Sequence, residues 1–63
     1  MRVDKTYSVD CKGVSPRDMM DVAKTRALAM AFKEFDYANH EAFVIAVDWR
    51  GSLARCHVAV WDL

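Results

Sequence analysis

Hydrophobic and polar residues alternate strictly near the beginning of the chain, from Val3 to Cys11. One side of this segment is apolar with the single exception of Lys5, and the other side is polar throughout. A period of two with β-branched and aromatic residues is typical of a half-buried strand. The pattern therefore predicts a strand over residues 3–11, which ends before Gly13.

A helix is predicted after this strand. Ser15 can cap the first free N–H groups, and Pro16 suits the first helical position because it has no N–H to leave unpaired. We expect the helix to run from there to about Phe35 or Asp36. Small residues recur at every fourth position, which predicts a smooth ridge that can lie close to a sheet. These residues are Ala23, Ala27 and Ala31.

The segment Phe43–Trp61 predicts a β-hairpin that is apolar on nearly both faces. Gly51-Ser52 suits the turn, because glycine can adopt the positive φ that a type II′ turn requires at its first central position. A turn placed one residue earlier would keep the faces but separate Asp48 from Arg55. The expected pairs on one face are Trp49–Ala54, Val47–Cys56, Ile45–Val58 and Phe43–Val60. Those on the other face are Asp48–Arg55, Ala46–His57, Val44–Ala59 and Ala42–Trp61.

These elements predict an α+β fold of the order β-α-β-β. The lengths favour a three-stranded antiparallel sheet in the order 2-3-1 with one helix packed on one face, and residues 1–63 as one small domain. One register for the first strand sets apolar against apolar residues and the charged Lys5 against Asp62. Its other pairs are Cys11–Cys56, Val9–Val58 and Tyr7–Val60.

The composition favours self-association. The chain has 63 residues, of which 54% are hydrophobic, whereas an average domain has about 45–50%. At this length the burial of apolar surface and the loss of chain entropy nearly cancel. A chain that is short of core volume and rich in apolar residues gains stability by association, so we expect a homo-oligomer, most simply a two-fold dimer.

Charge and segment composition exclude several function classes. Nine basic and nine acidic residues cancel, which argues against binding of nucleic acid. No segment approaches the length of a membrane span, and the first residues do not have the pattern of a signal peptide. We expect a cytoplasmic protein in which Cys11 and Cys56 are reduced.

Few residues suggest chemistry. Cys11 and Cys56 are expected to face each other under the helix as small buried hydrophobic residues, with a redox pair or half of a metal site as the alternative. His57 is expected opposite Asp10 as a surface or interface pair that positions the neighbouring strand, with an imidazole oriented as a general base as the alternative. The chain has no glycine-rich phosphate loop, metal-ligand cluster or catalytic motif. We therefore expect no enzymatic activity and no cofactor.

The outer face of the predicted sheet is the candidate site. Trp61 is expected there without cover, and tryptophan is enriched at interface hot spots. The free edge of the strand Phe43–Trp49 could also add to another sheet. We expect the following residues to form a protein-binding or oligomer interface: Val44, Ala46, His57, Ala59 and Trp61.

Two functions agree with this face. The leading hypothesis is a non-enzymatic protein-binding module, an inhibitor or accessory subunit of the size common among phages and other mobile elements. In size and element order, however, the predicted fold also resembles the dodecins, flavin-binding proteins that assemble as hollow dodecamers. That resemblance implies a flavin site between subunits, with Trp61 or Trp49 stacked on the flavin. Dodecins also use a glutamine beside the flavin, and this chain contains none.

Overall fold

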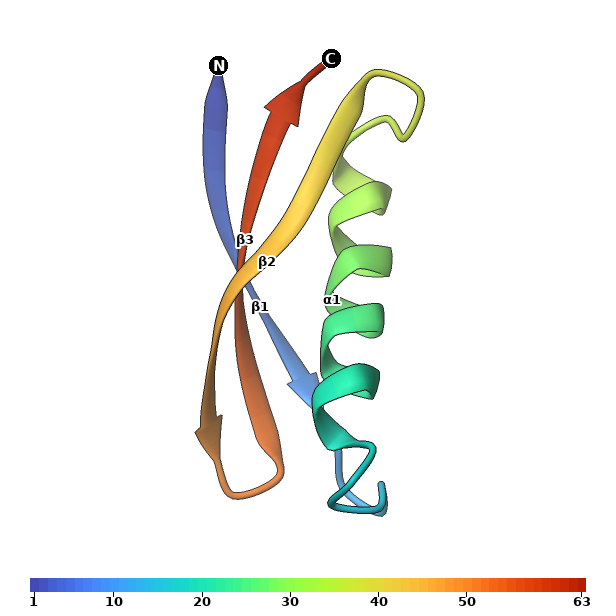
Figure 1. Cartoon of the computed structure of the whole chain (residues 1–63), viewed down its shortest axis with the longest axis vertical. Helices are drawn as coiled ribbons and strands as arrows, with labels where there is room; N and C mark the ends of the chain where they lie inside the picture. Colours follow the sequence, from blue (N-terminus) through green and yellow to red (C-terminus); the bar gives the residue numbers. More distant parts are fainter.

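The structure, a computed structural model of residues 1–63, has one helix and three strands (Figure 1). The elements are β1 (Arg2–Asp10), α1 (Met19–Glu34), β2 (His40–Arg50) and β3 (Leu53–Asp62). The strands form one antiparallel sheet in the order β1-β3-β2. Helix α1 runs along one face of this sheet and contacts all three strands. The predicted α+β fold and strand order are confirmed.

Helix α1 begins later than the sequence predicts. Residues 15–18 form a separate turn, in which the Asp18 N–H donates to the Ser15 carbonyl at 2.8 Å. The first helical bond runs from the Val22 N–H to the Asp18 carbonyl, so Asp18 and not Ser15 is the N-cap residue, and no side chain caps this end. The C-terminal end agrees with the sequence, because Phe35 is already extended.

The contact between α1 and the sheet is made of small side chains. The predicted alanine ridge is confirmed, since Ala23, Ala27 and Ala31 are fully buried. No residue in the buried core is larger than valine. Larger apolar side chains such as Leu28 and Trp49 pack only partly buried around this centre. The core residues outside α1 are Val9 of β1, Cys11 directly after β1, and Ala54, Cys56, Val58 and Val60 of β3.

Strand β2 contains a bulge that the sequence does not predict. Next to the turn the pairs are as expected, from Trp49 with Ala54 to Ala46 with His57. Ile45 is then an additional residue, and beyond it Val44 pairs with Val58. A bulge sets two residues of one strand against one of its neighbour, so the faces of all earlier β2 residues are exchanged. The four pairs predicted beyond this point, Ile45–Val58, Phe43–Val60, Val44–Ala59 and Ala42–Trp61, are therefore wrong.

The exchange of faces in β2 suits the narrow space beneath α1. Ala42 and Val44 now pack against the core, while Phe43 and Ile45 are 52% and 51% exposed. The smaller pair thus lies on the helix side, where the alanine ridge leaves little room. The larger pair lies in solvent.

The register between β1 and β3 also differs from the prediction. Tyr7 pairs with Cys56 instead of Val60, a displacement of four positions along β3. An even displacement keeps each side chain on its predicted face, so Val9 still reaches the core. Lys5 does not pair with Asp62; its Nζ lies 3.8 Å from Glu34 at the end of α1. The ion partner of Lys5 thus comes from the helix, which sheet pairing alone does not consider.

Glu34 also binds Tyr7, and so joins the end of α1 to the middle of β1. The Tyr7 hydroxyl donates a hydrogen bond to the Glu34 carboxylate. Burial raises the pKa of Tyr7 to about 12, with contributions from this hydrogen bond and from the charge of Glu34. The folded chain therefore holds the phenolic proton at a pH where the unfolded chain has lost it.

The bulge can be tested with a matched pair of threonine substitutions. Val44→Thr should lower the free energy of unfolding by about 1–2 kcal/mol, because it brings a hydroxyl toward the core. Ile45→Thr should change it by less than about 0.5 kcal/mol, because the side chain is exposed. Both variants keep a β-branched residue. Urea denaturation would contradict the bulge if Ile45→Thr were the more destabilising change.

Tyr7 should make stability fall at high pH. Its contribution is complete below the pKa of an unfolded tyrosine, about 10, and is lost as the pH rises through the folded value. The difference in free energy of unfolding between wild type and Tyr7→Phe should thus be largest near about pH 8, at about 1 kcal/mol. It should shrink steadily above pH 10. Urea titrations at several pH values check this, and a constant difference would be the contrary result.

Candidate functional site

One face of the sheet carries no helix, and we call it the outer face. It is formed by the residues that point away from α1 in each strand. These are Arg2, Asp4, Thr6, Ser8 and Asp10 of β1, Glu41, Phe43, Ile45, Ala46, Asp48 and Arg50 of β2, and Leu53, Arg55, His57, Ala59 and Trp61 of β3.

The structure places four of the five predicted interface residues on this face. Ala46 is exposed, and His57 and Trp61 are half-buried. Ala59 also points outward but is fully buried, and it lies between Asp4 and Phe43 on the adjacent strands. Val44 lies on the opposite face, against the core. Its predicted position is wrong, since the bulge at Ile45 reverses the faces.

An aromatic patch occupies the end of the outer face near the chain termini. We define this patch as Arg2, Phe43 and Trp61. The rings of Phe43 and Trp61 meet edge to face with centroids 5.8 Å apart, and the Arg2 guanidinium lies 5.2 Å from the Trp61 ring centroid. Arg2 is held in turn by Asp4, whose carboxylate lies 2.7 Å from Nε. Ile45 extends the apolar surface along β2.

Sequence reasoning missed Phe43 and Ile45 as site residues. Both were expected in the core, and they are about half exposed. The available signal was their size, because neither fits beside an alanine ridge as readily as Ala42 or Val44.

A polar row crosses the middle of the outer face. The Thr6 hydroxyl lies 3.2 Å from Nδ1 of His57, and Nε2 of His57 lies 2.8 Å from the Asp48 carboxylate. The predicted partner of His57, Asp10, is not in this row; its carboxylate accepts the N–H of Lys12. Pairing of β1 with β3 in the observed register sets Thr6 against His57, which explains the difference.

This row has the order hydroxyl, imidazole, carboxylate that occurs in catalytic triads. None of the hollows of the surface is lined by its residues. A triad also needs donors aimed at a developing oxyanion, and regular strands direct their N–H groups within the sheet. The arrangement is suited to tying three strands together.

The two cysteines are buried and free. Sγ of Cys56 lies 3.7 Å from the Ala23 carbonyl, and Sγ of Cys11 lies 3.9 Å from the Met19 carbonyl. Burial raises the pKa of Cys56, and the neighbouring Cys11 adds to this effect. Their predicted cross-strand pairing is wrong, because Cys56 pairs with Tyr7. Both thiols nevertheless belong to one core cluster.

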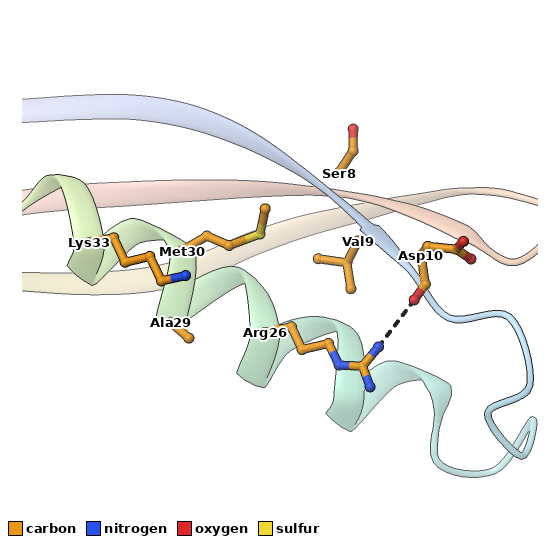
Figure 2. Close-up of a pocket in the computed structure, with 7 residues that line it drawn as sticks. All are labelled: Ser8, Val9, Asp10, Arg26, Ala29, Met30 and Lys33. Atoms are coloured by element: carbon orange, nitrogen blue, oxygen red, sulfur yellow. Dashed lines mark hydrogen bonds between the residues drawn. The ribbon is translucent and has the colours of Figure 1, made fainter.

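An open groove of about 360 Å³ runs between β1 and α1 (Figure 2). Nη1 of Arg26 donates to the Asp10 carbonyl across it at 3.1 Å. Figure 2 shows that Val9 points toward the helix and Ser8 away from it. The groove is lined by Ser8, Val9, Asp10, Arg26, Ala29, Met30 and Lys33.

Comparisons with known proteins add no relative. No protein-family model, no curated protein and no solved structure matches the chain.

Helix α1 lacks the length and apolar character needed to cross a membrane. No group of three or more His, Cys, Asp or Glu side chains is arranged to hold a metal ion.

The thiols should be unreactive in the folded protein. Because both are buried and thiolate formation is disfavoured at Cys56, a native sample should react with Ellman's reagent at least about 100-fold more slowly than one in urea. Two thiols per chain should appear on unfolding. Rapid reaction of either thiol in the native protein would instead indicate an exposed redox cysteine.

Proposed function

We propose that the chain is a non-enzymatic protein-binding module, an inhibitor or accessory subunit, that acts as a homo-oligomer and binds a partner protein through the outer face. The observation that carries this proposal is the aromatic patch with Ile45 beside it. Exposed phenylalanine and isoleucine in a small chain mark a surface that gains from being covered. Tryptophan and arginine are the residue types that dominate binding energy at interfaces.

The charges around the patch describe the partner. Asp4 and Glu41 lie near the aromatic rings, and Asp48 and Arg55 lie farther along the same face. A rim of both signs is poorly suited to a polyanion and suits a protein surface with an apolar centre and mixed charges. The module would therefore recognise a folded partner of that composition.

The outer face is also held in place before binding. Its three strands are joined by regular ladders and by the polar row through His57. A surface that is ordered in the free protein loses little entropy on association. This order favours recognition by a preformed sheet over folding on binding.

The flavin-binding alternative receives less support. A stacked flavin needs a free face of the tryptophan ring, but Arg2 lies over the ring of Trp61 and Phe43 contacts it. Trp49, the other candidate, packs against the core on the helix side. Titration with a flavin at micromolar concentration should leave the tryptophan fluorescence unchanged apart from absorption by the flavin.

Substitution of Phe43 tests the proposal. Immobilised wild-type protein and Phe43→Ser should be compared for capture of proteins from lysate of the source organism. A hot-spot residue contributes at least about 2 kcal/mol, so capture of the specific partner should fall about 30-fold or more. Met20→Ser is the matched control, because Met20 is 42% exposed on the helix and lies outside the outer face.

Circular dichroism should show that both variants remain folded. The proposal is contradicted if every captured protein binds wild type and Phe43→Ser equally well. It is also contradicted if Met20→Ser causes the larger loss.

A further inference from the structure

The outer edge of β1 is regular and has no strand beside it, and of its backbone groups only the Asp10 carbonyl, at its end, is bound by a side chain, that of Arg26. The N–H of Cys11 donates to the Ser52 carbonyl of the β3 side at 2.8 Å. In an antiparallel ladder, alternate residues turn their backbone groups toward the same neighbour. The odd-numbered residues of β1 therefore face β3, and the even-numbered residues direct N–H and C=O to the free edge. The Asp10 carbonyl supports this assignment, because it accepts a hydrogen bond from Arg26 of the helix and not from β3.

The other edge of the sheet is less suited to pairing. Strand β2 is interrupted by the bulge at Ile45, and bulges are a device by which proteins prevent edge-to-edge association. The nine residues of β1 contain neither a bulge nor a proline. The uninterrupted hydrogen-bonding edge of the molecule is thus β1, not the β2 edge that the sequence favours.

The sequence of β1 is complementary to itself in one antiparallel register. With the two-fold axis at Thr6, the free-edge residues pair with one another: Arg2 lies opposite the partner's Asp10, and Asp4 opposite the partner's Ser8. Both ends of the shared ladder then carry an opposite-charge pair, which stabilises cross-strand neighbours.

Other registers are less favourable. An axis at Lys5 places two lysines side by side, and an axis at Tyr7 places Asp4 opposite the partner's Asp10. Like charges directly opposite destabilise a ladder. Axes farther from the centre shorten the shared ladder, and an axis at Asp4 also sets two aspartates together.

The β1 side chains on the sheet face that carries α1 also fit this register. Val3 is 38% exposed, and it would lie beside the partner's Val9. Val9 lines the groove of Figure 2 together with Ala29 and Met30. The exposed valine of each copy would therefore enter the apolar part of the groove of the other. Lys5 would lie beside the partner's Tyr7, whose hydroxyl is bound to a carboxylate.

We infer that two copies of the chain pair through β1 in the antiparallel register centred on Thr6. The product is a six-stranded sheet with both helices on one face and two aromatic patches on the other. This inference deepens the self-association within the proposed function by naming its surface, its partner and its register.

Cysteine crosslinking tests the register. The Thr6 positions of the two copies would be about 5.5 Å apart between Cα atoms, within the range of a disulfide. The Ser8 positions would be displaced by four residues along the strand, about 13 Å. Under mild oxidation Thr6→Cys should therefore form a covalent dimer at least ten times faster than Ser8→Cys. These two variants are matched, because both residues are exposed on the same face of the same strand.

Proline substitution tests the edge. Thr6→Pro removes a backbone N–H that would donate to the partner, and proline is tolerated where the N–H of an edge strand faces solvent. Sedimentation equilibrium should show a dimer dissociation constant at least ten times higher than that of Thr6→Val. Thr6→Val loses the same hydroxyl but keeps the N–H, so it controls for the contact with His57.

The outcomes separate the two proposals. Preferential crosslinking of Thr6→Cys together with weakening by Thr6→Pro supports the β1 dimer. A dimer in which Thr6→Cys and Ser8→Cys crosslink equally overturns this register, while self-association and partner binding stand. A wild-type chain that stays monomeric at hundreds of micromolar overturns self-association altogether, whereas the Phe43→Ser capture experiment still decides partner binding.

Discussion

The close approach of α1 to the sheet is the constraint on which the rest of this structure depends. Three alanines of the helix meet alanine, cysteine and valine side chains of β3 and β1, and nothing larger is fully buried. Such a contact allows a short chain to pack at the density of a protein interior. It also limits how much apolar volume the core can hold. A chain with this many hydrophobic residues must then place its larger ones elsewhere.

The distribution of large side chains follows from that limit. Phe43, Ile45 and Trp61 lie on the outer face, and Met20 and Met30 lie beside the helix contact. The β2 bulge is the local device that achieves the first part of this arrangement. It directs Ala42 and Val44 into the narrow space and sends their larger neighbours outward. Core packing and the candidate binding surface therefore have one physical origin.

Local patterns in the sequence were sufficient for the elements and their order. Strict alternation identified β1, the alanine spacing identified the buried side of α1, and Gly51 with its positive φ identified the hairpin turn. These features are encoded within a few residues of one another. The outward position of Trp61 and His57 could also be predicted, because both lie an even number of residues from Arg55 on one strand.

Features that depend on competition between similar pairings could not be predicted. Residues 42–47 are all apolar. An exchange of the residues that face the core with those that face outward therefore buries no polar side chain. The two registers of β1 differ by four positions and keep the same faces. What separates them is the contact of Lys5 and Tyr7 with Glu34, and the position of the helix is needed to see it. The aromatic patch was missed because the uniformly apolar residues 42–47 do not show which side chains face the core. The polar row through Thr6 was missed because it depends on the register of β1.

The central position of β3 has a consequence for how the chain folds. β3 follows both of its neighbours in sequence, yet each of them pairs only with it. Until β3 is in place, neither β1 nor β2 has a strand to pair with, and the apolar residues of both are uncovered. Non-local strand pairing is slow relative to helix formation, so we expect the helix to form before β1 joins the sheet. Both ladders of the sheet therefore wait for β3, and its pairing with β1 and β2 completes the fold in one cooperative step.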